Sequence, residues 1–197
     1  MKVVAFNGSP RANGNTAQSI QIVFAELQKE GIETELVQLG GRKVFGCLAC
    51  GKCWENKDNR CVRQDDEMNT FIEKMQEADG IIIGSPTYFS NVSTEVKALI
   101  DRCGFVAKAN DGEMLRGKVG AAVVSVRRAG STFVYSAINF FFGIAEMVIP
   151  SSSYWNMTLS LEPGDVQKDE EGIQTFQTLG RNMAKLLKQI DASKKLQ

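Results

Sequence analysis

The sequence predicts an α/β protein of three layers, in which a parallel sheet of five strands lies between helices. Short apolar runs alternate with amphipathic helical segments along the whole chain, which is typical of repeated strand–helix–strand units. The run at 81–85 is apolar at successive positions, as expected of a strand covered by helices on both faces. Five strands favour the sheet order 2-1-3-4-5 over the six-stranded dinucleotide-binding order.

The first half of the chain contains predicted strands at 2–6, 33–39 and 81–85. Apolar residues at helical spacing predict one helix after the first strand, ending before Gly31, and a second helix before the third strand. The residues are Ile20, Val23, Phe24 and Leu27 in the first helix and Met68, Phe71, Ile72 and Met75 in the second.

The second half contains a predicted fourth strand at 117–126, with a helix on each side of it, and a fifth strand at 147–149 or 154–157. A polar loop is expected at 159–172, before a final helix. The helix after the fourth strand is apolar nearly all round, which predicts burial against its own core and a partner subunit. The helical patterns are Val92, Val96, Leu99, Ile100 and Cys103; Phe133, Ala137, Phe140, Phe141 and Ile144, with Val134, Tyr135 and Phe142 pointing elsewhere; and Phe176, Leu179, Met183, Leu186, Leu187 and Ile190.

Length and composition limit the functions that the chain can have. The 197 residues are most simply one domain, 1–197, with a cysteine-rich insertion at about 46–62. The 23 basic and 23 acidic residues cancel, so nucleic-acid and anionic-membrane binding are not expected. The chain has no histidine, which removes the commonest general base and zinc ligand. No signal or membrane-spanning pattern is present, so a reducing cytoplasmic setting is expected.

The loop at 8–16, after the first predicted strand, has the composition of a phosphate-binding turn. It reads GSPRANGNT and leads straight into a helix, whose first N–H groups and positive dipole end attract an anion. Small side chains such as Asn13 can donate hydrogen bonds. The patterns of triphosphate and dinucleotide sites are absent, which favours a monophosphate. The alternative is an ordinary turn in which Asn15 or Thr16 caps the helix.

The loop at 85–93, after the third strand, contains the adjacent aromatic residues Tyr88 and Phe89 among hydroxyl and amide groups. This composition suits a flat heteroaromatic ring, although the two aromatics could simply close the core. The first and third strands flank the point where the strand order reverses, so the two loops together describe one ligand, FMN.

The loop at 125–131, after the fourth strand, could contact the same flavin through the backbone of Gly130. Arg127 and Arg128 could neutralise a flavin anion or attract a nicotinamide phosphate. A solvated arginine pair is the alternative.

Four cysteines lie within fifteen residues, at Cys47, Cys50, Cys53 and Cys61, in the pattern C-x2-C-x2-C-x7-C. Three thiolates at this spacing can ligate three corners of one [4Fe-4S] cluster, and the fourth completes it. Structural zinc usually takes two separated pairs. A redox-active dithiol, a disulfide or cysteines that hold nothing stay open as alternatives. Cys103 lies on an apolar helical stripe and is expected in the core.

Together these motifs resemble the iron-sulfur flavoproteins, a group within the flavodoxin-like NADPH-dependent FMN reductase superfamily. The resemblance rests on the GSPRANGNT and SPTYFSNVS loops, the helix end KALIDRC and the cysteine motif, and covers about residues 1–145 well. It implies a flavodoxin-like fold, non-covalent FMN and one [4Fe-4S] cluster per subunit. By position, it implies phosphate contacts from Ser9, Arg11, Asn15 and Thr16, and ring contacts from Pro86, Thr87, Tyr88, Phe89 and Asn91. The seven-residue gap before Cys61 is at the long end of the family's range.

The resemblance also implies a homodimer or homotetramer in which flavin and cluster meet across a subunit interface. The expected function is that of an FMN-dependent oxidoreductase in which FMN exchanges electrons with the cluster. The cysteine segment follows the second strand and leaves the sheet at the same edge as the flavin loops, which favours this coupling. NAD(P)H or a ferredoxin-type partner is the expected donor. The alternatives are an NAD(P)H-dependent FMN or quinone reductase without a cluster, and a flavin-loaded regulatory module.

Overall fold

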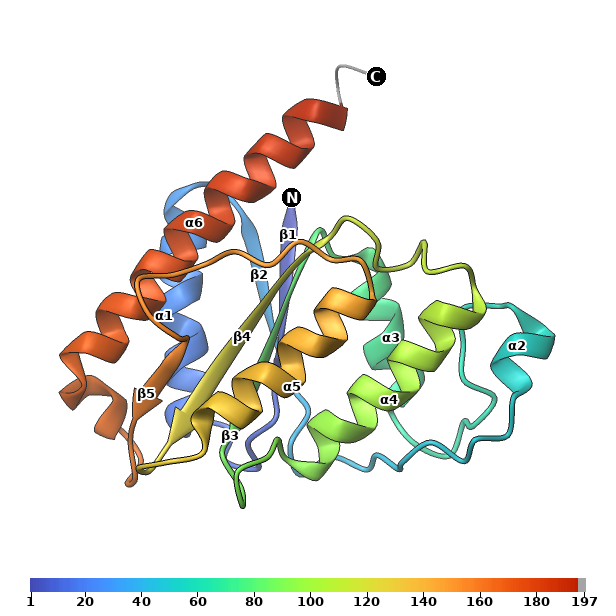
Figure 1. The fold of residues 1–197 in the computed structure, drawn as a ribbon, viewed down its shortest axis with the longest axis horizontal. Helices are drawn as coiled ribbons and strands as arrows, with labels where there is room; N and C mark the ends of the chain where they lie inside the picture. Colours follow the sequence, from blue (N-terminus) through green and yellow to red (C-terminus); the bar gives the residue numbers. More distant parts are fainter. Residues whose placement is uncertain (195–197) are drawn as a thin grey trace.

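The computed structural model describes residues 1–194 and contains a five-stranded parallel sheet between layers of helices (Figure 1). The order β2-β1-β3-β4-β5 confirms the prediction. The last three residues of the predicted domain 1–197 lie outside the described residues. The strands are β1 Lys2–Asn7, β2 Glu33–Gln38, β3 Gly80–Pro86, β4 Val119–Val126 and β5 Met157–Leu159.

The helices form two layers, because the sheet is apolar on both faces and each face needs cover. One buried cluster unites α3, α4 and α5 with one face, and the other unites α1 and α6 with the opposite face. Every residue of β4 is buried, as expected of a strand between two helical layers. The helices are α1 Asn15–Lys29, α2 Lys52–Asn56, α3 Met68–Glu77, α4 Thr94–Ala109, α5 Ser131–Ile144 and α6 Glu170–Lys194, with a 3-10 helix at Asp165–Lys168.

Two predicted segments differ in the structure. The fifth strand is Met157–Leu159, while the alternative at 147–149 makes only a single bridge, from Val148 to Val119. The predicted loop 159–172 contains a 3-10 helix and the start of α6. The acidic residues at the start of α6 were assigned to a polar loop. In the structure they lie in the first turn of the helix, where carboxylates are favoured. The short helix α2 in the cysteine segment was also not predicted.

The aromatic helix α5 turns a different face to the sheet from the one that the sequence pattern suggests. Phe141 of the predicted face is buried, but Phe133 and Phe140 are 67% and 75% exposed. The other buried apolar side chains are Val134, Ile138 and Phe142. A Cβ at Gly120 of β4 would lie 2.8 Å from the Phe142 ring, so the missing side chain makes room for this contact. Gly120 therefore allows Phe142 to pack closely against β4.

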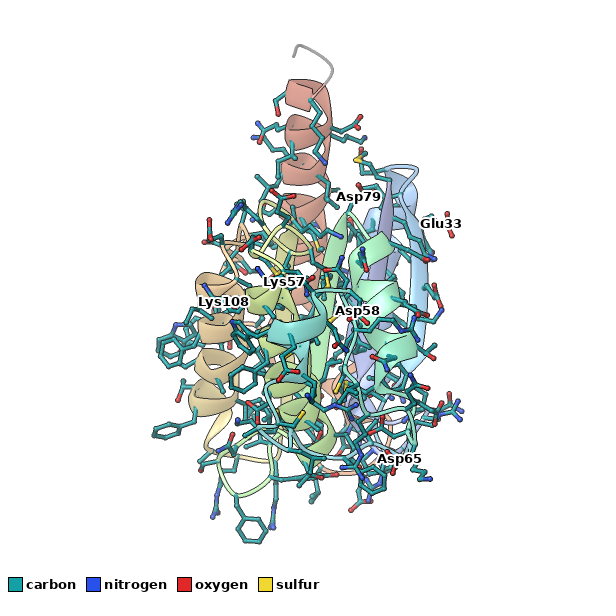
Figure 2. All side chains as sticks on the ribbon, turned by 90° about the vertical axis from the view of Figure 1, so that its right-hand side faces the viewer. Glu33, Lys57, Asp58, Asp65, Asp79 and Lys108 are labelled. Atoms are coloured by element: carbon teal, nitrogen blue, oxygen red, sulfur yellow. The ribbon has the colours of Figure 1, made fainter. Side chains whose placement is uncertain are left out.

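The cysteine segment, residues 46–62, extends from the edge of the layered core and carries α2 beside α4 (Figure 1). In Figure 2, Glu33 and Asp79 mark the end of the sheet where strands begin, and Asp65 lies towards the opposite end. No helix within residues 1–194 is both long and apolar enough to span a bilayer.

Candidate functional site

A cleft of about 220 Å³ opens where β1, β3, β4 and β5 end, and we call it the strand-end pocket. Because parallel strands end at one edge of the sheet, four loops that are far apart in sequence meet there. The lining residues are Ser9, Arg11, Asn15, Thr16, Pro86, Thr87, Tyr88, Ser125, Arg127, Ser160 and Leu161. The structure thus brings together eight of the twelve residues predicted to bind a cofactor.

Three hydroxyl groups of the strand-end pocket are buried without a hydrogen-bond partner within residues 1–194. They are the Oγ1 of Thr87 and the Oγ atoms of Ser125 and Ser160. A buried hydroxyl without a partner destabilises the fold, and such groups are rare in native proteins. Three of them around one cleft indicate a ligand that supplies the missing hydrogen bonds.

The first loop presents the amino end of α1 to the strand-end pocket. The residue that caps α1 is Gly14, so the helix starts without a side-chain cap, and the alternative of a capping Asn15 or Thr16 is wrong. The turn is fixed because Asn7 Oδ1 accepts the Ser9 N–H at 3.1 Å and Ser9 Oγ accepts the Arg11 N–H at 3.2 Å. The uncapped helix end and Arg11 make this part of the pocket suitable for a phosphate.

Asn15 holds the loop after β5 against the strand-end pocket. Its Nδ2 donates to the Glu162 carbonyl at 2.8 Å, and its Oδ1 accepts the Gly164 N–H at 2.9 Å. This side chain therefore shapes a wall of the pocket. It explains why Ser160 and Leu161, which the sequence analysis did not select, reach the site.

The loop after β3 places part of the predicted ring-binding set. Tyr88 and Asn91 exchange backbone hydrogen bonds of 3.0 and 2.9 Å around a two-residue turn. Phe89 and Ser90 both have positive φ, and Phe89 points fully into solvent. Phe89 and Asn91 are not among the described residues that line the pocket. In this structure they form the turn that follows Tyr88 and make no direct contact with the pocket.

Two further predicted residues, Asn13 and Gly130, also lie outside the described lining. Asn13 is exposed, and its carbonyl accepts a hydrogen bond from Gln18. Gly130 has a φ of +90°, and a Cβ there would lie 2.5 Å from Ser90 Oγ. Gly130 therefore permits the close approach of the loops after β3 and β4.

A second cavity, of about 150 Å³, lies between the cysteine segment and α4, and we call it the cysteine pocket. All four predicted ligands, Cys47, Cys50, Cys53 and Cys61, line it. Its volume is that of roughly five waters at ~30 Å³ each. Within residues 1–194, no three cysteine, aspartate or glutamate side chains approach closely enough to hold a single metal ion. The four cysteines thus line a shared cavity and form no single-ion site among the described residues.

Contacts from α3 and α4 fix the cysteine segment. Trp54 of α2 packs edge-on against Phe105 of α4, with ring centroids 5.5 Å apart. The backbone of Cys61 exchanges two hydrogen bonds of 2.8 Å with the side chain of Asn69 on α3. All five cysteines are free. Burial raises the pKa of Cys53, although its own backbone N–H and that of Trp54 act in the opposite direction.

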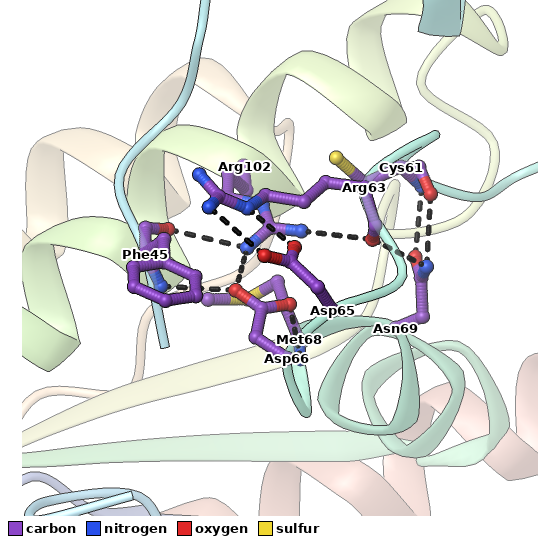
Figure 3. Close-up of polar contacts among 8 residues, drawn as sticks. All are labelled: Phe45, Cys61, Arg63, Asp65, Asp66, Met68, Asn69 and Arg102. Carbon is purple, nitrogen blue, oxygen red and sulfur yellow. Dashed lines mark hydrogen bonds and ion pairs between the residues drawn. The ribbon is translucent and has the colours of Figure 1, made fainter. Parts of the chain in front are cut away.

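A buried ion pair between Arg102 of α4 and Asp66 lies beside the cysteine pocket (Figure 3). Their side chains are 1% and 0% exposed. Burial alone would raise the pKa of Asp66, but hydrogen bonds from Arg102 and from the N–H groups of Phe45 and Met68 together lower it. Asp66 is thus held as a carboxylate that anchors the start of the segment.

Cys103 is fully buried in the core, as predicted, and burial raises the pKa of its thiol to about 12. The sequence analysis missed Ser125, Ser160 and Arg102 as site residues. The rule that parallel strands end at one edge points to the loops that contain Ser125 and Ser160, but it does not single out these two serines. Arg102 lies in a regular helix, and no local signal distinguishes it.

The comparisons with known proteins show the family of the chain. Residues 1–161 match the family model of NADPH-dependent FMN reductases. The chain is 36% identical over 197 residues to an iron-sulfur flavoprotein of Methanocaldococcus jannaschii, covering 96% of this chain and 99% of the relative. It is 30% identical over 196 residues to an iron-sulfur flavoprotein of Methanosarcina thermophila, covering 98% and 99%.

Solved structures show that the fold is flavodoxin-like. A WrbA-like flavodoxin of Agrobacterium tumefaciens has a TM-score of 0.65 at 15% identity, covering 95% of this chain and 97% of that one. RosB with a bound riboflavin-phosphate intermediate has a TM-score of 0.71 at 20% identity, covering 98% and 81%. Family and fold together make the chain a flavin-dependent oxidoreductase. It belongs to the NADPH-dependent FMN reductase family and, within that family, to the iron-sulfur flavoproteins.

Proposed function

We propose that the chain binds FMN in the strand-end pocket and a [4Fe-4S] cluster in the cysteine pocket, and that electrons pass between the two. Bound FMN supplies one- and two-electron chemistry and a cluster supplies one-electron transfer. The observation that carries the proposal is the pairing of two sites on one chain. One site contains three buried hydroxyls without a partner within residues 1–194, and the other is lined by four cysteines.

The phosphate of FMN would lie at the amino end of α1, with Arg11 as counter-ion and Thr16 in the first turn. The ring would lie along the loops after β3 and β4, where Thr87 and Ser125 offer hydroxyl groups to its polar rim. Arg127 at the mouth would favour a negatively charged flavin or a nicotinamide phosphate. The side chains hold and orient the flavin, and no histidine is needed for this role.

The four cysteines would ligate the cluster one iron each. A cluster of four irons spreads its ligands over four metal atoms, whereas four thiolates on one zinc at about 2.3 Å converge tightly. Cys47 and Cys50 are exposed on a loop, and Gly51 between them and α2 has a φ of +72°. A reducing cytoplasm, in which thiols stay free, fits this ligand set.

The electron path would cross between two copies of the chain. Among the described residues, the strand-end and cysteine pockets have no lining residue in common. Figure 1 shows α4 and α5 side by side on one face of the sheet, with α2 beyond α4. Exposed Phe105, Phe140 and Ile144 make this face apolar next to the cysteine pocket. A second copy covering it, in a homodimer or homotetramer, would bring one copy's flavin to the other copy's cluster.

The decisive experiment is anaerobic purification and cluster reconstitution, followed by flavin, iron and sulfide analysis of the wild type, Cys61→Ser and Cys103→Ala. We expect about one FMN in all three proteins. We expect four irons per chain in the wild type and Cys103→Ala, and a large loss of iron in Cys61→Ser. Flavin without iron in the wild type would reject the cluster and leave the flavin site intact. No flavin would reject the whole proposal.

A second candidate is an NAD(P)H-dependent FMN or quinone reductase that holds no cluster. The match of residues 1–161 to the family model of NADPH-dependent FMN reductases favours it. Stopped-flow reduction of the flavin separates the two functions. Rapid bleaching by NADPH alone supports the reductase, and reduction only by a ferredoxin-type donor supports the electron-transfer protein.

The proposed assembly is tested by sedimentation of Phe140→Asp and of the matched control Phe140→Leu. We expect the aspartate to dissociate the oligomer with little change in monomer stability, because Phe140 is 75% exposed in the single chain. The leucine should keep the oligomer. A wild-type monomer at working concentration would contradict the proposed path.

A further inference from the structure

Arg102 ties the two ends of the cysteine segment to α4. Its Nη1 donates to the Phe45 carbonyl at 3.2 Å, just before the segment, and also pairs with Asp66. Its Nη2 donates to the Arg63 carbonyl at 3.3 Å, just after the segment (Figure 3). These bonds use the two outer nitrogens of the guanidinium. They explain a structural role for the side chain, but they do not use its Nε–H.

The Nε–H of Arg102 is buried and has no hydrogen-bond partner within residues 1–194. The Arg102 side chain is 1% exposed, and it lines the cysteine pocket together with all four cysteines. A buried donor without an acceptor destabilises a protein, so its presence at a cavity needs an explanation. The neighbouring Arg63 differs, because its Nε–H is already bonded to Asp65 at 2.7 Å.

We infer that the Arg102 Nε–H donates a hydrogen bond to a sulfur atom of the cluster held in the cysteine pocket. The inference rests on the proposed function and assigns a role to a residue outside the cysteine motif. Hydrogen bonds to the sulfurs and the second-shell contacts of a cluster set its reduction potential. A donor stabilises the more negative, reduced state, so it raises the potential. Arg102 is therefore a positioning residue that also tunes the cluster.

The negative charge of Asp66 limits how Arg102 can act on the cluster. Asp66 neutralises the guanidinium within the protein, so the long-range effect of the Arg102 charge on the cluster is reduced. What remains is the short-range, directed contact of one N–H group with sulfur. The test therefore compares two variants that both lack the ion pair and that differ in this N–H.

Two double variants meet this requirement: Asp66→Asn with Arg102→Gln, and Asp66→Asn with Arg102→Met. Both remove the ion pair and leave no buried charge unpaired. Counted from Cα, glutamine carries its side-chain N–H₂ at the position of the arginine Nε, whereas methionine carries a methyl group there. The two side chains have nearly the same length, and only glutamine carries N–H donors at the position of Nε, together with a carbonyl oxygen on the preceding carbon.

The measurement is the reduction potential of the reconstituted cluster, followed by the electron paramagnetic resonance of the reduced state. We expect the methionine variant to be harder to reduce than the glutamine variant by about tenfold in equilibrium constant, equivalent to about 59 mV for one electron. Equal potentials would overturn the inference alone, because both variants would still hold a cluster. A wild type that takes up no iron overturns the proposed cluster and this inference with it.

A second measurement applies if neither double variant retains iron. The holoprotein is labelled with nitrogen-15 arginine in an Arg63→Lys background, which removes the other arginine of the pocket. A hyperfine coupling between an arginine nitrogen and the reduced cluster supports the contact. The nitrogen-15 coupling should disappear when the arginine is unlabelled, which assigns the coupling to arginine. If the labelled protein shows no such coupling, the inference is overturned.

Discussion

Thr87→Val separates ligand binding from stability in the strand-end pocket. Valine has nearly the shape of threonine, so the change replaces one hydroxyl by a methyl group without opening a cavity. The Thr87 Oγ1 is buried and unpartnered within residues 1–194, and such a group costs about 1–3 kcal/mol. The free energy of unfolding of the flavin-free protein should therefore rise, by about 1 kcal/mol. The affinity for FMN should fall, because the hydrogen bond proposed between the hydroxyl and the ligand would contribute about 1 kcal/mol, or roughly fivefold in Kd.

The assay measures both quantities on one preparation. Urea unfolding of the flavin-free protein gives the free energy of unfolding, and quenching of FMN fluorescence gives Kd. Ser93→Ala is the matched control, since Ser93 Oγ caps α4 by accepting the Val96 N–H outside the pocket. Its loss should lower stability by about 1 kcal/mol and leave Kd unchanged. If Thr87→Val lowers stability and leaves Kd unchanged, the hydroxyl is structural and the assignment of the pocket is refuted.

Three further predictions test the framework of the two sites. Gly130→Ala should lower the free energy of unfolding by about 1–3 kcal/mol in urea, because its φ is positive and a Cβ would lie 2.5 Å from Ser90 Oγ; Gly31→Ala, with open space around it, should cost less. The folded-state pKa of Asp66 is lowered, so its contribution is complete above its ordinary pKa of 3.8 and is lost as pH falls through the lower folded value. The stability difference between wild type and Asp66→Asn should therefore shrink in acid titrations, and a constant difference would contradict the lowered pKa. Iodoacetamide should alkylate the four thiols of the cysteine segment in the native protein free of flavin and cluster and spare Cys103, whose burial raises its pKa to about 12; early labelling of Cys103 in mass spectra would contradict this.

The candidate site was only partly predictable from the sequence. The loop at 8–16 carries a local signal, since a turn of small polar residues directly before a helix is typical of a phosphate-binding site. Ser125 and Ser160 carry none, because a single serine at the end of a strand is ordinary. Their importance comes from three unpartnered hydroxyls meeting at one cleft, a property of the assembled sheet edge. Asn15 shows the same limit, because it holds the loop at 162–166, far away in sequence.

By itself, the sequence determined the fold class, the strand order and the cysteine pattern of this flavodoxin-like protein. Hydrophobic periodicity and ligand spacing are local properties, and they can be identified without knowledge of long-range contacts. Only the tertiary structure decided which face of α5 is buried and that Arg102 is paired with Asp66, 36 residues away. Such contacts depend on which side chains the sheet order brings together. The absence of histidine fits the proposed function, since side chains that position cofactors need not move protons themselves.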